Sequence, residues 1–417
     1  MELFPQRRNA VLVPRLRQRV PATQRHSPRD EGFDSMKRNV SGTISDAAAR
    51  AASAAVSPAA SARLSGTLIR CGLALSTMVF AVAAVAADLV PVAQVEQDYV
   101  KPQRLVDVGD GRRMNLFCLG EGRITVVFDA GLSDWSSTWA LIQPAVARTT
   151  RACSYDRAGM GYSDPSPRPR TPQAAVEDLH ALLERGGIGG PVVLVGHSLG
   201  GFNAKLFAVT HPEQVAGLVL VDPAEERLWD RVESSLARRF GAAPVRAARA
   251  EDEKDMAAAI AHFADCAQTT RTGGLTEQKY RRCTDPVRLP LGAAILKERR
   301  ALQQTAAYQD TQWSEIAHCM YAKDAEADAR YRRLFAGRAP LRDLPLIVLT
   351  HGLYDLSDAN WEVHYRSWRK AHELTAAQSR RGRHEMVAFA NHNIQVDRPD
   401  AVVDAVAAVL AMIEHPQ

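Results

Sequence analysis

One segment constrains this chain more than any other: a strand-like apolar run that meets Gly-x-Ser-x-Gly and then turns helical. The run is 192–195, the pattern is Gly196-His-Ser-Leu-Gly200, and helix-forming residues follow at 202–208. A turn this sharp requires φ above zero at Ser198, and it leaves no room for a side chain at either glycine. The segment therefore predicts a nucleophile elbow, with the serine hydroxyl at the carboxyl edge of a sheet and a helix N-terminus beneath it.

A serine hydroxyl becomes a nucleophile only with a base and an acid that orients the base. In folds that carry their serine on such an elbow between a strand and a helix, the chain order is serine, acid, histidine. The strand-like run 386–390 is followed by His392 and then by an apolar-periodic helix at 400–412, so His392 is the predicted base. His372 and His384 come earlier, in polar and charged surroundings, and are predicted to be surface residues.

The acid is expected where the preceding strand, 344–350, reaches the carboxyl edge. Asp355 ends a Gly-x-x-Asp pattern there and is the preferred residue. Asp358 remains a competitor, three residues further on. Asp222 is a third option. It ends an earlier strand, 215–221, and some enzymes of this architecture take their acid from that point. We interpret Asp222 instead as a carboxylate that packs under the elbow, and His351 as a structural residue of the strand-end turn.

An acyl-transfer intermediate also needs two backbone N–H groups for its oxyanion. The first is expected from Leu199, directly after the serine. The second is expected from Leu132, in the loop that follows the apolar strand 124–131. Because the donors are backbone groups, the side chains at these positions say little about them.

Five segments together carry a resemblance to a known family: Cys118-Leu-Gly-Glu-Gly-Arg, Val126-Val-Phe-Asp-Ala-Gly131, Arg151-Ala-Cys-Ser-Tyr-Asp-Arg-Ala-Gly-Met-Gly-Tyr-Ser-Asp164, Val193-Leu-Val-Gly-His-Ser-Leu-Gly-Gly201 and Gly217-Leu-Val-Leu-Val-Asp222. They resemble the α/β-hydrolase superfamily, and within it bacterial serine hydrolases of the esterase-like branch. The resemblance implies an α/β fold with a mostly parallel, doubly wound sheet. It supports Ser198, His392, Leu132 and Leu199 in their roles, and it disfavours branches with an aspartate nucleophile.

The region 223–342 interrupts the alternation of strands and helices. It is charged and helix-prone at 225–240, 247–266, 293–304 and 311–337. After the sixth strand, such an insertion is expected to fold over Ser198 as a helical cap. The alternative is a solvated insertion without contact to the site. The core of the fold is then expected to comprise 100–222 and 343–417.

The net charge of +5 lies in the N-terminal part of the chain. Residues 1–70 hold 12 basic and 5 acidic side chains, whereas the remaining 347 hold 40 basic and 42 acidic ones. The nearly neutral body argues against nucleic-acid binding. Residues 1–65 are poor in aromatics and rich in Arg, Ala, Ser and Pro, which predicts a disordered basic leader.

An apolar run without charges extends from Cys71 to Ala87. Ala84-Val-Ala86 matches a cleavage site for a signal peptide, and 17 residues is near the lower limit for crossing a bilayer. We therefore expect 66–87 to be a signal peptide or an N-terminal membrane anchor. The protein is expected to be exported, periplasmic or secreted, or else held at a membrane through 71–87.

Export would permit disulfides. Cys118 and Cys153 fall on strands that are neighbours in this fold, so they could face each other, or they could remain two buried thiols. Cys266 and Cys283 could close a short loop and leave Cys319 outside it. The spacing of these cysteines matches no metal motif, so no metal site is predicted.

No cofactor is predicted either. Gly159-Met-Gly161 lacks the third glycine of a dinucleotide loop and is interpreted as a turn. Arg157, Arg168 and Arg170 are interpreted as surface or loop residues.

The predicted function is hydrolysis of a carboxylic ester, or a related acyl bond of a small molecule, by a Ser-His-Asp triad through an acyl-enzyme. The alternatives are an acyltransferase that uses the same triad and a ligand-binding protein that keeps the fold without catalysis.

Overall fold

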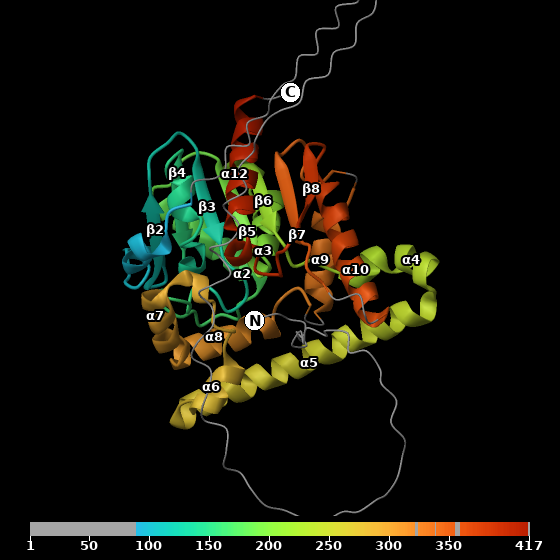
Figure 1. The fold of residues 1–417 in the computed structure, drawn as a ribbon, viewed down its shortest axis with the longest axis horizontal. Coiled ribbons are helices and arrows are strands. Elements are labelled where there is room, and N and C mark those ends of the chain that lie inside the picture. The colour runs from blue at the N-terminus through green and yellow to red at the C-terminus, as the bar shows by residue number, and fades with distance from the viewer. Residues whose placement is uncertain (1–88, 322–323, 338, 355–358, 416–417) are drawn as a thin grey trace, which may run out of the picture. The chain divides into compact units, whose positions relative to one another are not determined.

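A computed structural model describes residues 89–321, 324–337, 339–354 and 359–415. The predicted leader, 1–65, and the apolar segment 66–87 lie outside the described residues. The described chain forms an eight-stranded sheet of order β1-β2-β4-β3-β5-β6-β7-β8 with helices on both faces (Figure 1). The strands are β1 (Arg104–Gly109), β2 (Arg112–Leu119), β3 (Thr125–Asp129), β4 (Arg151–Tyr155), β5 (Val192–His197), β6 (Val215–Val221), β7 (Leu346–His351) and β8 (Gly382–Val387).

The sheet is parallel from β4 to β8 and antiparallel at β1 and β2. Parallel strands are covered on both faces, which favours continuous apolar runs over alternation. Every residue of β3 and β5 is buried accordingly. This architecture confirms the predicted fold class, and it brings the carboxyl ends of the parallel strands to one edge.

Helices cover both faces of the sheet. α1 (Gln143–Val146) and α12 (Pro399–Glu414) pack on one face, and α2 (Pro172–Arg185), α3 (Leu199–Thr210) and α10 (Ala359–Ala376) pack on the other. α12 starts with a proline, whose fixed φ suits the first helical position, and buries an apolar stripe of Val402, Ala405, Val406 and Val409. The short elements outside the region between β6 and β7 are α11 (Ile394–Asp397), η1 (Val92–Gln94), η2 (Glu96–Asp98), η3 (Ser136–Trp139) and η4 (Pro212–Gln214).

The region between β6 and β7 is helical, as predicted. It contains α4 (Leu228–Phe240), α5 (Ala242–Gly273), α6 (Glu277–Cys283), η5 (Leu289–Leu291), α7 (Ala293–Gln303), α8 (Ala306–Ala317) and α9 (Ala325–Leu334). The single helix predicted at 311–337 is wrong. Asp324 accepts hydrogen bonds from the N–H groups of Glu326 and Ala327, and this N-cap starts α9 as a separate helix.

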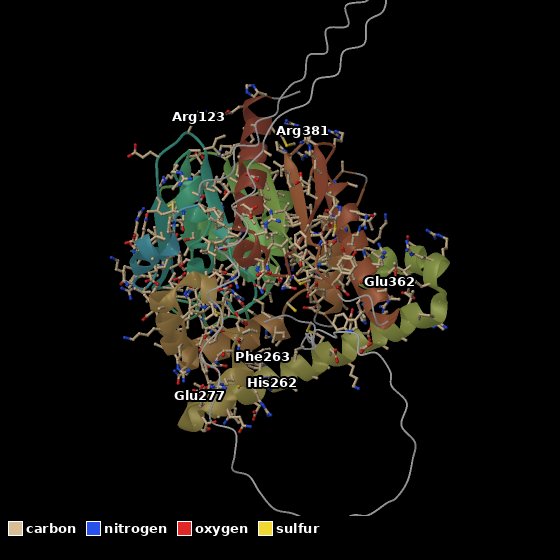
Figure 2. The ribbon with its side chains drawn as sticks, viewed as in Figure 1. Arg123, His262, Phe263, Glu277, Glu362 and Arg381 are labelled. Carbon is tan, nitrogen blue, oxygen red and sulfur yellow. A yellow bond between two sulfur atoms is a disulfide. The ribbon has the colours of Figure 1, made fainter. Side chains whose placement is uncertain are left out.

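Several of these helices lie along the carboxyl edge of the sheet. Figure 1 shows α5, α6, α7 and α8 beyond one end of the strands. Figure 2 labels Arg123, two residues before β3, and Arg381, directly before β8. Both lie at the opposite end from His262 and Glu277 of α5 and α6. The inserted helices therefore occupy the side on which the strands end.

Two disulfides form among the described residues, and each joins a pair that the sequence had singled out. Cys118 and Cys153 lie directly opposite each other on the neighbouring strands β2 and β4, and their Cα atoms are 4.0 Å apart. Cys266 and Cys283 link α5 to α6. Cys319 is buried, and its thiol donates a hydrogen bond of 3.2 Å to the carbonyl of Ile316.

Across the parts of residues 89–415 that the structure describes, no helix has both the length and the apolar character needed to cross a membrane.

Candidate active site

Ser198 lies between the end of β5 and the start of α3, with φ at 50° and ψ at −117°. This is the strained conformation that the sequence predicts. A Cβ on Gly196 would come within 2.3 Å of the carbonyl oxygen of Gly200, and one on Gly200 would come equally close to that of Asp129. Both glycines are therefore required sterically, and Ser198 is held at the carboxyl edge with 4% of its surface exposed.

The imidazole of His392 is bound to a carboxylate. Its Nδ1 lies 2.5 Å from Oδ2 of Asp222, and because a carboxylate only accepts, Nδ1 carries the proton. Asp222 directly follows β6, has φ at 45° and is fully buried. Asp355 and Asp358 lie outside the described residues. Since Nδ1 has one proton to donate, Asp222 takes the place for which the sequence analysis preferred Asp355.

Backbone contacts hold Ser198, Asp222 and His392 in one region. The N–H of Ser198 donates to Val221, the residue before Asp222, and the carbonyl of Ser198 accepts from Ala224, two residues beyond it. Nε2 of His197, beside the serine, donates to the carbonyl of His392 over 2.9 Å. These hydrogen bonds therefore hold together three segments: the end of β5, the end of β6 and the loop after β8.

A second histidine contacts Asp222. Nδ1 of His351 donates to Oδ2 over 2.8 Å, and its backbone N–H donates to Oδ1 over 3.1 Å. Burial alone would raise the pKa of Asp222, but the charges and hydrogen bonds of His351 and His392 outweigh it and hold that pKa well below its ordinary value. Asp222 is therefore an anion across the neutral pH range.

His372 and His384 form a chain with Thr350 near this carboxylate. Nε2 of His372 donates to the carbonyl of Pro223, so its Nδ1, 2.6 Å from Oγ1 of Thr350, accepts from that hydroxyl. Oγ1 in turn accepts from Nε2 of His384. The prediction that His372 is a surface residue is wrong, because α10 folds back over the sheet and buries it completely.

We expect the free energy of unfolding to fall as the pH drops from about 7.5 to about 5.5. Burial lowers the pKa of His372 in the folded protein, whereas the unfolded chain takes up a proton near a pKa of about 6.5. The unfolded state then binds more protons below that pH, and stability decreases by up to about 1.4 kcal/mol per pH unit for such a residue. Urea unfolding of the wild type and of His372→Gln checks this. The variant should show the shallower pH dependence, and equal slopes would contradict the argument.

The loop after β3 runs against the elbow. A Cβ on Gly131 would lie 2.7 Å from Nδ1 of His197 and 3.4 Å from Cβ of Ser198, so only glycine fits there. Within the described parts of the chain, the backbone N–H groups of Leu132 and Leu199 donate no hydrogen bond. The two N–H groups predicted as oxyanion donors thus have no acceptor among the described residues.

Arg157 joins this loop to the inserted helices, which the sequence analysis missed. Its side chain is 2% exposed, against the predicted surface or loop position, and Arg170 is buried as well. Arg157 donates to Asp129, to the carbonyls of Ala130 and Gly131, and to Glu315 of α8. The sequence did contain a signal for this position. Arg157 is the second residue after the buried strand β4, so it must lie close to the carboxyl edge.

Two groups of described residues have metal-ligating atoms close together. One comprises His262, Cys266 and Cys283, in which both cysteines are joined in the disulfide. The other comprises Asp222, His351 and His392, in which both imidazoles already donate to one carboxylate oxygen. In each group the atoms that would bind a cation are committed to other partners.

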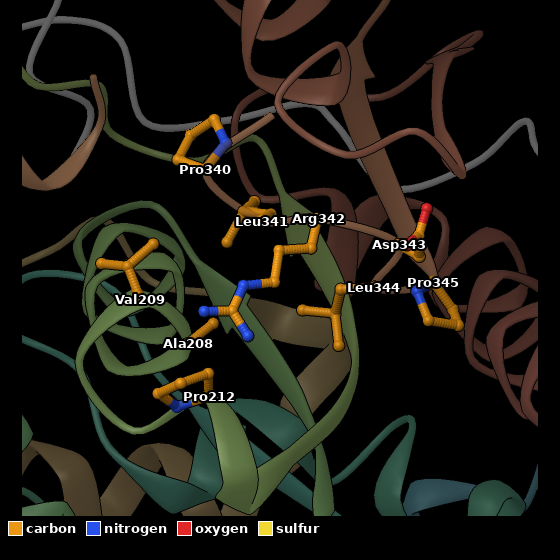
Figure 3. Close-up of a pocket in the computed structure, with 9 residues that line it drawn as sticks. All are labelled: Ala208, Val209, Pro212, Pro340, Leu341, Arg342, Asp343, Leu344 and Pro345. Atoms are coloured by element: carbon orange, nitrogen blue, oxygen red, sulfur yellow. The ribbon is translucent and has the colours of Figure 1, made fainter. Parts of the chain in front are cut away.

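A cavity of about 280 Å³ lies elsewhere (Figure 3). It is lined by the end of α3 and by the segment before β7: Ala208, Val209, Pro212, Pro340, Leu341, Arg342, Asp343, Leu344 and Pro345. Because α3 runs antiparallel to the strands, this cavity is at the amino edge of the sheet, away from Ser198.

Comparison with known proteins identifies a family. A family described as the alpha/beta hydrolase fold matches residues 124–397. The uncharacterized protein YqjL of Bacillus subtilis is 34% identical over 105 residues, which is 25% of this chain and 42% of that protein. A (Lyso)-N-acylphosphatidylethanolamine lipase of Mus musculus is 34% identical over 104 residues, covering 24% of this chain and 30% of the lipase. The chain spans less than half the length of these relatives.

Among solved structures, Lip1 from Acinetobacter baumannii AYE superposes with a TM-score of 0.54 at 16% identity. The alignment covers 78% of this chain and 96% of that one. At this identity the likeness supports the fold alone.

Proposed function

The chain belongs to the α/β-hydrolase fold family, and from that premise we propose that it is a serine hydrolase that cleaves a carboxylic ester, or a related acyl bond, through an acyl-enzyme. The observation that carries the proposal is the 2.5 Å contact from Nδ1 of His392 to Asp222, beside a serine held with φ at 50°. A serine nucleophile, a base and an acid that orients the base are the groups that acyl transfer through a serine requires.

In the proposed mechanism His392 is the general base. Its Nδ1 proton is held by Asp222, so the lone pair is on Nε2 and can take the proton of Ser198 as Oγ attacks the carbonyl carbon. The anionic Asp222 stabilises the imidazolium that forms. Asp222 thereby replaces Asp355 in our assignment of the acid.

The developing oxyanion is assigned to the N–H groups of Leu132 and Leu199. The N-terminus of α3 adds a positive partial charge at the same place. The imidazolium then returns its proton to the leaving alcohol, and the C–O bond breaks to leave the acyl group on Ser198. Water, deprotonated by His392, attacks the acyl-enzyme and releases the carboxylic acid together with the free serine.

The helices α4 to α9 are proposed as a cap over this site, corresponding to the predicted insertion at 223–342. Buried ion pairs between the loop after β3 and this region support the assignment. Asp134 of that loop pairs with Arg288 and, over 2.7 Å, with Arg299. A solvated insertion without contact to the site would not need such pairs, because burying a charge costs free energy that its partner must offset.

Export from the cytoplasm is proposed as well. The two disulfides, Cys118–Cys153 and Cys266–Cys283, support it because such bonds persist in oxidising compartments and are rare in a reducing cytosol.

The proposal is tested on the purified chain with a fluorophosphonate probe and with short p-nitrophenyl esters. We expect covalent labelling of one serine, identified as Ser198 by peptide mass spectrometry, and steady ester hydrolysis. Pre-incubation with the probe should abolish hydrolysis. Absence of both labelling and hydrolysis, in protein that shows a cooperative unfolding transition, would overturn the proposal in favour of a binding protein.

A further inference from the structure

We propose that Arg157 and Glu315 are positioning residues that aim the N–H of Leu132 at the oxyanion, so that helix α8 of the inserted region takes part in setting the catalytic geometry. This inference rests on the proposed function, since Leu132 matters only if the site performs acyl transfer. Neither residue touches the substrate in this scheme.

The first step concerns one peptide group. The carbonyl of Gly131 and the N–H of Leu132 belong to the same planar trans peptide, so they point in opposite directions. That carbonyl accepts from Nη2 of Arg157 over 2.7 Å and from the N–H of Asp134 over 3.2 Å. Two donors on the carbonyl oxygen therefore fix the direction of the N–H on the other side of the plane.

The next two peptide groups, on either side of Ser133, are held from α8. The N–H of Ser133 donates to Oε2 of Glu315 over 3.2 Å, and the carbonyl of Ser133 accepts from the hydroxyl of Tyr308 over 3.0 Å. Ser133 has φ at 61°, an uncommon conformation for a residue with a side chain. Contacts from the inserted helix thus hold the backbone immediately after Leu132 in a shape that it would not favour by itself.

Arg157 and Glu315 bind each other as well as the loop. Nε of Arg157 lies 2.7 Å from Oε1 of Glu315, Nη2 lies 3.0 Å from Oε2, and both side chains are 2% exposed. Nη1 extends the network to Asp129 over 2.9 Å. Burial by itself lowers the pKa of Arg157, but the carboxylates of Glu315 and Asp129 more than reverse this and raise it. The guanidinium is therefore permanently charged, and its planar fork suits simultaneous contacts to several oxygens.

Two further contacts bring α8 against the same region. A Cβ on Gly159 would lie 2.0 Å from Oγ1 of Thr311, so α8 packs directly on the turn that follows Arg157. The side chain of Leu132 packs on a cluster of Phe263, Cys266, Cys283 and Ile316 from α5, α6 and α8. The backbone and the side chain of Leu132 are both in contact with the inserted helices.

The test compares Arg157→Lys with Arg112→Lys. Arg112 is also buried and pairs with Asp178 over 2.9 Å, but it lies on β2, away from the loop. In both variants a charge remains while a buried bidentate fork is lost, and urea unfolding measures the loss of stability in each. Arg157→Lys should lower kcat by about 10²–10³, the effect of losing one oxyanion donor, with KM within about threefold of wild type. Arg112→Lys should keep kcat within about threefold.

A transition-state analogue supplies the readout that a purely structural role would not change. The affinity for a trifluoromethyl ketone, which forms an oxyanion on Ser198, should fall in Arg157→Lys by the same factor as kcat/KM. Glu315→Gln keeps an oxygen for Ser133 but loses the charge, so its kcat should fall less, by about tenfold. Should Arg157→Lys fail to fold, Glu315→Gln carries the same comparison.

The outcomes separate this inference from the proposed function. If the wild type is neither labelled by the fluorophosphonate nor active on esters, the proposed function itself is wrong, and no comparison of variants is needed. An active wild type whose Arg157→Lys and Glu315→Gln variants keep the kcat and analogue affinity of Arg112→Lys overturns the positioning role alone.

Discussion

Replacing Ser198 with alanine is expected to lower kcat for a p-nitrophenyl ester by about 10⁴–10⁶. The substitution removes the atom that would form the acyl-enzyme, so catalysis falls to what the oxyanion donors and binding supply without a nucleophile. The variant should fold, because Ser198 is held by its backbone contacts to Val221 and Ala224 and these remain. Steady-state kinetics and fluorophosphonate labelling measure the effect, and labelling should disappear completely.

Ser367→Ala is the matched control. This serine is also buried, but it lies on α10 and its hydroxyl donates to the carbonyl of His364. We expect wild-type kinetics and full labelling. Ser198→Ala combined with His392→Ala should be no worse than Ser198→Ala alone, because residues that act as a unit are not additive. Turnover of Ser198→Ala within tenfold of the wild type would rule out this serine as the nucleophile.

Replacing Asp222 with asparagine is expected to lower kcat by about 10⁴. The amide keeps the size of the side chain, and asparagine tolerates the positive φ at this position. An amide NH₂ facing Nδ1 favours the imidazole tautomer whose proton is on Nε2, and that tautomer cannot accept the serine proton. Kinetics with p-nitrophenyl esters, normalised to the serines that react with the probe, measure the loss.

Asp355→Asn and Asp358→Asn test the acid that the sequence analysis preferred. Both variants should keep kcat within about threefold of the wild type, while Asp222→Asn loses it. A large loss in Asp355→Asn, with Asp222→Asn near the wild type, would return the assignment to Asp355. Circular dichroism of Asp222→Asn shows whether its loss reflects unfolding, because Asp222 also binds His351.

Much of the fold could be predicted because its signals are local. The glycines of the elbow are required by clashes within a few residues of the turn, so the strained φ at Ser198 follows from the pattern itself. The first four residues of β5, 192–195, form an unbroken apolar run, which is typical of a strand covered on both faces. The break between α8 and α9 was missed because the Asp324 cap competes with a segment whose composition favours helix throughout.

The acid was harder to predict because both candidate strands end at the same edge. Asp222 follows β6 and Asp355 follows the adjacent strand β7, so chain order alone admits either. Within the described residues, the positive φ at Asp222 turns its carboxylate to meet His392 and His351. The direction in which the carboxylate of Asp222 points cannot be read from any periodicity in the sequence.

The sequence by itself determined the sheet, the elbow at Gly196 to Gly200 and the histidine that follows the last strand, because each depends on sterics or periodicity within one short segment. Only the tertiary structure decided that Asp222 binds His392, and that Arg157 and Glu315 hold the loop around Leu132. These contacts join residues 170 and 158 positions apart. Their partners are chosen by how β6, α8 and the loops meet in space, and a one-dimensional pattern does not contain that information.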